Sequence, residues 1–165
     1  MKRSVPGSFA VFALLLLASS AARADVSEAV QKKFKGQILV SAEAFPDTAA
    51  DDAEMIRQLK KAHTGLIARS KGESVPVWRF RFMAFMDRKP PATQVSLDFY
   101  TDDKKKEFVA QKRLAGIDPA LTLLEAQVEL SEDDGLTADR SYAVKLTCEV
   151  KGKETVLATT KLRTR

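Results

Sequence analysis

Residues 77–86 read VWRFRFMAFM, and this stretch decides the fold because its apolar side chains repeat with the period of a β-strand. One face of such a strand is wholly apolar and consists of Trp78, Phe80, Phe82, Ala84 and Met86. The opposite face carries Val77, Arg79, Arg81, Met83 and Phe85. Burying an unpaired guanidinium group costs much free energy. The arginine face is therefore expected to point to solvent and the aromatic face into a core.

The same stretch loosely resembles the aromatic octapeptide of RNA-recognition motifs, through Phe80, Phe82, Met83 and Phe85. Stacking on RNA bases would require Phe80 and Phe82 to be exposed. That arrangement would turn Arg79 and Arg81 into the core, and the glycines of the RNA motif are absent from the stretch. The sequence therefore predicts no binding of nucleic acid.

From residue 77 onwards the alternation of apolar and polar side chains continues nearly throughout. It predicts strands over 77–86, 93–101, 107–114, 121–130, 141–150 and 154–163. The stretch GQILVSAEAF, residues 36–45, predicts an earlier strand, and residues 50–70 predict one amphipathic helix with an apolar stripe of Ile56, Leu59, Leu66 and Ile67. This order favours a mainly β fold: an immunoglobulin-like antiparallel β-sandwich of about seven strands, with the helix inserted between the first and second strands.

The C-terminal segment carries a second indication of this fold. Tyr142 begins a strand directly after a turn, where its hydroxyl can reach back to upstream backbone. That corner, and the hairpin YAVKLTCEV-KGK-ETVLATTKL that follows, resemble the closing strand pair of immunoglobulin-like domains. The resemblance implies a fold and no function. The chain departs from the family because its early strand offers Trp78, Phe80 and Phe82 where a cysteine facing Cys148 is usual.

A return of the chain through Pro90 and Pro91 predicts that residues 77–86 pair with residues 93–101. Pairing Met86 with Thr93 puts Phe80 opposite Phe99 and Phe82 opposite Leu97 inside, with Arg81 opposite Asp98 and Arg79 opposite Tyr100 outside. The outward side chains form the candidate partner surface, namely Arg79, Arg81, Met83, Phe85, Asp98 and Tyr100. Met83 and Phe85 contact either a partner or the helix, and we favour the helix because its apolar stripe needs a surface to cover.

The N-terminus predicts export. Lys2 and Arg3 precede an apolar run over residues 9–18, and Ala22-Arg23-Ala24 forms an A-x-A cleavage pattern. The apolar run is shorter than the roughly 20 residues that span a membrane. We therefore expect residues 1–24 to be a signal peptide cleaved after Ala24, and residues 25–165 to form a single domain without a transmembrane segment. The expected location is the bacterial periplasm or the outside of the cell.

Charge and cysteine content limit the possible functions. The chain has 27 basic and 22 acidic residues, and removal of residues 1–24 leaves 24 against 22, a net charge of +2. So small a charge gives no reason to expect a polyanionic partner. Cys148 is the only cysteine, so no intramolecular disulfide can form.

Few residues are candidates for catalysis or metal binding. His63 is the single histidine, and Cys148 is in phase with the inward residues of its strand. Acidic clusters at 51–54, 102–103 and 132–134 could offer calcium oxygens, but turn and cap chemistry explains each of them separately. No metal, cofactor or recognisable catalytic motif is expected. The sequence predicts a non-catalytic binding or accessory module that acts through protein–protein contacts. The alternative is a carrier of an apolar ligand or lipid, with Trp78, Phe80, Phe82 and Phe99 lining a cavity.

Overall fold

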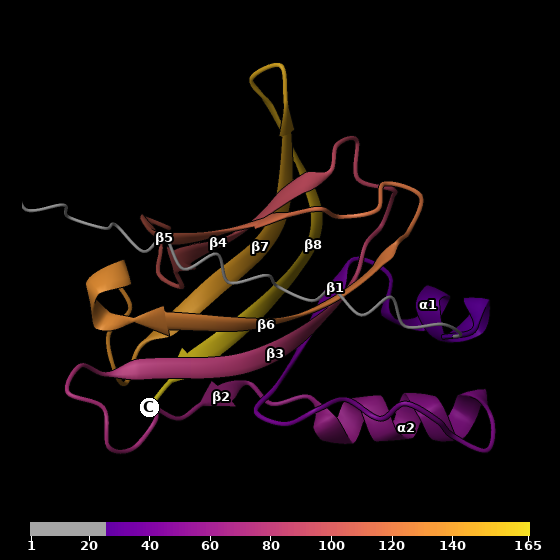
Figure 1. Cartoon of the computed structure of the whole chain (residues 1–165), viewed down its shortest axis with the longest axis horizontal. Coiled ribbons are helices and arrows are strands. Elements are labelled where there is room, and N and C mark those ends of the chain that lie inside the picture. The colour runs from indigo at the N-terminus through magenta and orange to yellow at the C-terminus, as the bar shows by residue number, and fades with distance from the viewer. Residues whose placement is uncertain (1–25) are drawn as a thin grey trace, which may run out of the picture.

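The computed structural model describes residues 26–165, which are mainly β (Figure 1). The elements in chain order are α1 (Glu28–Phe34), β1 (Gln37–Ser41), α2 (Asp52–Ala62), β2 (Leu66–Ile67), β3 (Val77–Phe85), β4 (Gln94–Thr101), β5 (Phe108–Ala115), β6 (Leu123–Ser131), the 3-10 helix η1 (Glu132–Asp134), β7 (Ser141–Val150) and β8 (Lys153–Thr164). The expected signal peptide lies outside the described residues. The strands predicted from residue 77 onwards are confirmed, with ends shifted by a few residues.

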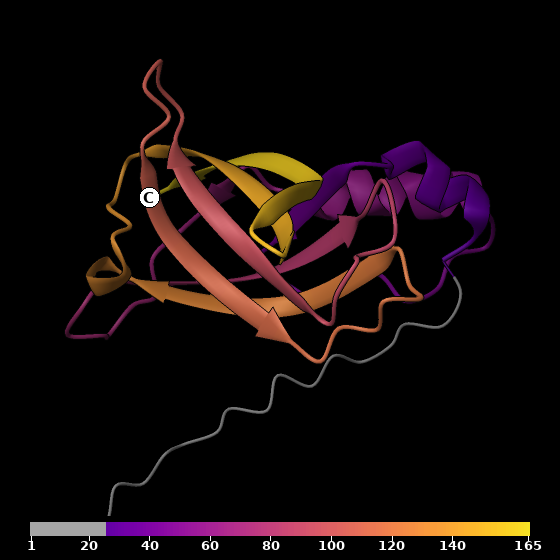
Figure 2. The same cartoon turned by 90° about the horizontal axis from the view of Figure 1, so that it is seen from above.

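The strands form one sheet that is nearly closed into a barrel, in the order β5-β4-β7-β8-β1-β3-β6, and β2 pairs with β8 (Figure 2). The immunoglobulin-like sandwich is not confirmed, because the strands curve around one interior instead of forming two sheets packed face to face. The expectation of a wholly antiparallel sheet is wrong, because β1 and β2 both run parallel to β8. Mainly β composition is the part of the fold prediction that holds.

The helices lie together at one end of the sheet (Figures 1 and 2). The predicted insertion of a helix between the first and second strands is not confirmed, because neither helix lies between two strands of the sheet. The prediction of a helix over 50–70 was too long: α2 ends at Ala62, and Leu66 and Ile67 of the predicted stripe belong to β2. His63 ends α2 because its backbone is extended and its Nδ1 accepts the N–H of Val40 at 3.0 Å. Helix α1 was not predicted; Ser27 caps it, and its apolar side chains Val30 and Phe34 are buried.

The two sides of β3 contact two separate apolar clusters. Its side chains divide between these clusters as the alternation of the sequence predicts. Trp78, Phe80, Phe82, Ala84 and Met86 belong to the large cluster inside the sheet. Met83 and Phe85 belong to a smaller cluster between the sheet and the helices, where the rings of Phe85 and Phe34 lie 5.1 Å apart. The expectation that the predicted helix covers Met83 and Phe85 is confirmed for α2, and the unpredicted helix α1 covers them as well.

The predicted partner of β3 is wrong. β3 pairs with β1 and β6, whereas β4 pairs with β5 and β7. Residues 86–93 do not form a hairpin turn, because they cross to other strands: Met86 N–H donates to the carbonyl of Thr122 and Asp87 N–H to that of Leu157. Phe80 and Phe99 still meet, but across the interior, with ring centroids 6.5 Å apart and edge to face. Alternation indicates the face of a side chain and leaves the neighbouring strand open.

The predicted tyrosine corner is present although the sheet is a single one. Tyr142 is fully buried, and its hydroxyl accepts the N–H of Thr137 at 2.8 Å. This bond connects the start of β7 to the loop that leaves η1. A local tyrosine corner therefore does not determine whether the strands form a sandwich or a curved sheet.

Candidate interaction surface

The structure divides the six residues of the predicted partner surface between two places. Arg79, Arg81, Met83 and Phe85 lie on β3, and Asp98 and Tyr100 lie on β4. Three strands separate β3 from β4 in the sheet order, namely β7, β8 and β1. The six side chains therefore do not form one surface.

On β3 the outward side chains are engaged within the molecule. Arg79 forms ion pairs with Glu129 at 2.5 Å and with Glu73 at 3.0 Å. Hydrogen bonds that the Arg79 guanidinium donates to Glu129 and then to Glu73 raise its pKa. Arg81 is half-buried beside Ser41 and Gln127, its cross-strand neighbours. With Met83 and Phe85 beneath the helices, this half offers little apolar surface to a partner.

On β4 the outward residue Asp98 is buried within a network of polar side chains. Its Oδ2 accepts a hydrogen bond from the Thr147 hydroxyl at 2.6 Å, and its Oδ1 accepts one from Gln111 Nε2 at 2.9 Å. Lys145 lies directly opposite Asp98 on β7. A buried carboxylate with two donors ties β5, β4 and β7 together on the outer face of the sheet.

Beside this network lies a group that we call the aromatic patch, consisting of Tyr100, Phe108 and Lys145. The rings of Tyr100 and Phe108 meet edge to face at 5.7 Å, and Lys145 Nζ lies 4.5 Å from the Tyr100 ring centroid. Phe108 is 58% exposed, the largest value among the exposed large apolar residues of the described chain. Burial, followed by the charges of Glu154 and Asp98, raises the pKa of Tyr100. Its hydroxyl therefore stays protonated and able to donate at neutral pH.

Sequence reasoning found Tyr100 but missed Phe108 and Lys145. The register between β4 and β5 shifts between Phe99 and Tyr100, so that Val109 is an extra residue on β5. Without this bulge Phe108 would share the inward face of Ala110 and Leu114. The bulge turns the Phe108 ring outward. The alternation of apolar and polar residues in the sequence does not predict this bulge.

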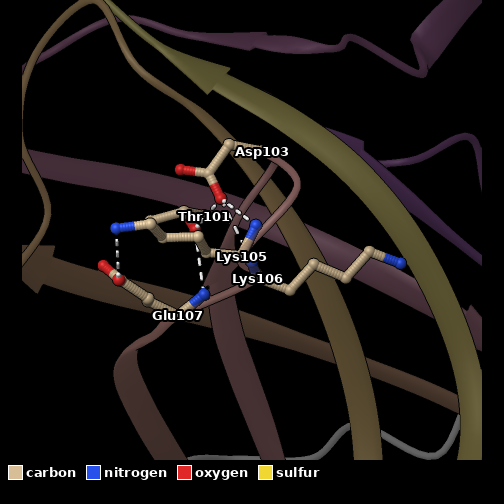
Figure 3. A network of polar contacts seen from close by, with 5 residues as sticks. All are labelled: Thr101, Asp103, Lys105, Lys106 and Glu107. Carbon is tan, nitrogen blue, oxygen red and sulfur yellow. Dashed lines mark hydrogen bonds and ion pairs between the residues drawn. The ribbon is translucent and has the colours of Figure 1, made fainter.

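The hairpin between β4 and β5, which separates Tyr100 from Phe108 along the chain, is held by a network of hydrogen bonds (Figure 3). Asp103 Oδ1 accepts hydrogen bonds from the Thr101 hydroxyl at 2.9 Å and from the N–H groups of Lys105 at 2.9 Å and Lys106 at 3.1 Å. The Thr101 hydroxyl accepts the N–H of Glu107 at 3.0 Å. These bonds, led by that of Thr101, lower the pKa of Asp103. The turn is thus internally braced, and its lysines are exposed next to Phe108.

The remaining candidates for chemistry have structural contacts. The imidazole of His63 accepts a backbone hydrogen bond at the end of α2, and Cys148 is buried with its sulfur 3.3 Å from the carbonyl of Gln94. Asp51 caps α2, and Asp134 caps η1 through Ser131. Within residues 26–165 no group of three His, Cys, Asp or Glu side chains is placed to hold a metal ion.

A pocket of about 310 Å³ lies in the loop before β3, lined by residues 69–74 and Pro76. Its walls come from one loop, and none of the predicted surface residues lines it. The pocket is polar and includes Glu73, whose carboxylate is paired with Arg79. It therefore offers a partner no apolar contact comparable to Phe108.

Comparison of the chain with protein-family models, with curated proteins and with solved structures found no match. Among the described residues, no helix combines the length and apolar character needed to cross a membrane. What the chain does has to be argued from its own surface.

Proposed function

We propose that the chain is an exported, non-catalytic binding or accessory module that acts through protein–protein contacts, with the aromatic patch at the centre of its contact surface. The observation that carries the proposal is Phe108, whose ring is 58% exposed and held edge to face against Tyr100. Interface centres are enriched in aromatic side chains on rigid supports. The braced β4–β5 hairpin and the Asp98 network supply that support.

The surroundings of the aromatic patch suit a protein partner. Lys145 adds a charge over the Tyr100 ring, and the hydroxyl of that ring can donate to an acceptor. Polar side chains around an aromatic centre are the usual composition of a contact between soluble proteins. His63 and Cys148 have structural contacts, which supports a non-catalytic role.

A photo-crosslinking side chain in place of Phe108, in the full chain in the cells that produce it, tests this function. We expect a defined protein adduct at position 108 and none when the same side chain replaces Leu121, which is 43% exposed in the β5–β6 link. With the captured protein purified, Phe108→Ala should weaken binding by about 2 kcal/mol. Leu121→Ala is the matched control and should leave binding unchanged. Equal affinities for the two variants would refute a contact centred on Phe108.

The alternative function is a carrier of an apolar ligand or lipid, and the near closure of the sheet favours it (Figure 2). The side chains that would line its cavity, Trp78, Phe80, Phe82 and Phe99, all lie inside the sheet. They are at most 2% exposed and belong to one packed cluster, and Phe80 and Phe99 contact each other. A packed interior supports the binding module over the carrier.

A further inference from the structure

The curved sheet has two free edges. In the sheet order β5 comes first and β6 last, and neither pairs on its outer side with another strand of residues 26–165. The link of residues 116–122 joins these two strands, yet they do not form a ladder with each other (Figure 2). β5 is the edge that borders the aromatic patch, because Phe108 begins it.

The register identifies which backbone groups of β5 are free. Thr101 N–H donates towards β5, to the carbonyl of Glu107, whereas Asp102 N–H donates towards β7, to the carbonyl of Ser141. This direction alternates along an antiparallel strand. The β5 residues bonded to β4 are therefore Ala110, Lys112 and Leu114. The N–H and C=O groups that point away from β4 belong to Gln111, Arg113 and Ala115.

This free edge is accessible over a limited length. Gln111, Lys112, Arg113 and Ala115 are exposed, and the strand contains no proline. At the other end the edge is blocked: a Cβ on Gly135 would lie 2.8 Å from the carbonyl oxygen of Val109, so the chain after η1 covers that carbonyl. Exposed, unblocked edges are templates for another strand. The available template runs from residue 111 to residue 115.

The edge is basic and its charges are unpaired. Within residues 26–165 Lys112 and Arg113 form no ion pair; Arg113 Nε donates to Gln111 Oε1 at 3.0 Å. Opposite charges on neighbouring strands stabilise pairing and like charges oppose it. If β5 paired with β5 of a second copy about a two-fold axis, Lys112 and Arg113 of one copy would lie close to Lys112 and Arg113 of the other. Self-pairing is therefore disfavoured, and an acidic strand is favoured.

We propose that the protein partner contributes an extended acidic segment, which adds to the sheet as an antiparallel strand along Gln111, Arg113 and Ala115 of β5. This inference rests on the protein-binding function proposed above and specifies the class of partner. Main-chain hydrogen bonds supply the pairing, as in other cases of strand addition. Acidic side chains on the outer face of the added strand meet Arg113, which pairs with Ser96 on the outward face of β4, and this face lies next to the aromatic patch.

The test uses the full chain with isotope-labelled amides and two capped nine-residue peptides, one alternating Glu with Val and one alternating Lys with Val. We expect the Glu peptide to slow amide exchange at Gln111, Arg113 and Ala115 by about tenfold or more. The amides of Gln127 and Glu129 on the β6 edge should be unaffected. The Lys peptide should protect none of them. Protection on β6, or equal protection by both peptides, would overturn the proposal.

Two variants separate backbone pairing from charge. Arg113→Pro removes a free-edge N–H without removing a bond to β4, since edge strands tolerate proline there, and should abolish the protection. Arg113→Glu keeps the N–H and should reduce protection by the Glu peptide by about threefold to tenfold. Protection by the Glu peptide that is unchanged in Arg113→Pro would exclude strand addition. So would β5 protection that appears without peptide and rises with protein concentration, because it indicates self-association.

These outcomes are distinct from failure of the proposed function. If Phe108→Ala weakens the captured partner while Arg113→Pro and Arg113→Glu bind it as the wild type does, the contact surface stands and strand addition is wrong. If a crosslinker at position 108 captures no protein and the Glu peptide still protects β5, the β5 edge binds strands. The aromatic patch is then not the surface that contacts a protein partner.

Discussion

At the scale of single residues, Asp98 shows how the outer face of the sheet is held. It projects away from the core between Leu97 and Phe99, yet it is 2% exposed, and Thr147 and Gln111 donate to its two oxygens. A buried carboxylate that lost a donor would retain the cost of its desolvation. The Thr147 bond, at 2.6 Å and fully buried, should therefore contribute most to the network.

We predict that Thr147→Val lowers the free energy of unfolding by about 1–3 kcal/mol, because it removes the hydroxyl and nearly keeps the shape of the side chain. Urea denaturation measures this change. Thr159→Val on the exposed outer face of β8 is the matched control and should change stability by no more than about 0.5 kcal/mol. An equal loss in both variants would show that β propensity, and not the bond to Asp98, sets the effect.

At the scale of elements, alternation was a sound guide to faces and a poor guide to neighbours. The inward set of β3 was predictable because each side chain of a strand points opposite to the previous one. The partners of β3 were not, since β1 and β6 lie far from it along the chain and any apolar face could pair with several strands. The bulge at Val109 and the early end of α2 arise from tertiary contacts, so Phe108 and β2 were missed for the same reason. Helix α1 has too few apolar positions to reveal itself by periodicity.

Helix α1 nevertheless covers part of β3, and the loss of its contacts with β3 should lower the free energy of unfolding. We predict that Phe34→Ala lowers the free energy of unfolding by about 3–5 kcal/mol, since Phe34 is buried against Phe85. Lys33→Ala, on the exposed side of α1, should stay within about 0.5 kcal/mol of the wild type. Calorimetry or chemical denaturation compares the two. A loss below 1 kcal/mol for Phe34→Ala would mean that α1 is not a fixed cover of β3.

At the scale of the whole molecule, the shape alone would suit either of the two functions considered. A sheet nearly closed around one interior can be a container, whereas a sheet filled with side chains is a scaffold that presents its outer face. Trp78 reports on the difference because it is fully buried in that interior, with its indole N–H 3.4 Å from the carbonyl of Arg165. It is the single tryptophan, so its emission can be assigned without ambiguity.

We predict that the interior takes up no apolar ligand. The emission of Trp78 should be blue-shifted, as for a buried indole, and should not change when anilinonaphthalene sulfonate or a long-chain fatty acid is added at neutral pH. A packed interior would have to lose side-chain contacts to admit a ligand. Phe80→Ala opens a cavity there and is the positive control, because cavities of this kind can bind small apolar molecules. Saturable quenching of Trp78 in the wild-type chain would favour the carrier, and would then require the core around Phe80 and Phe99 to open.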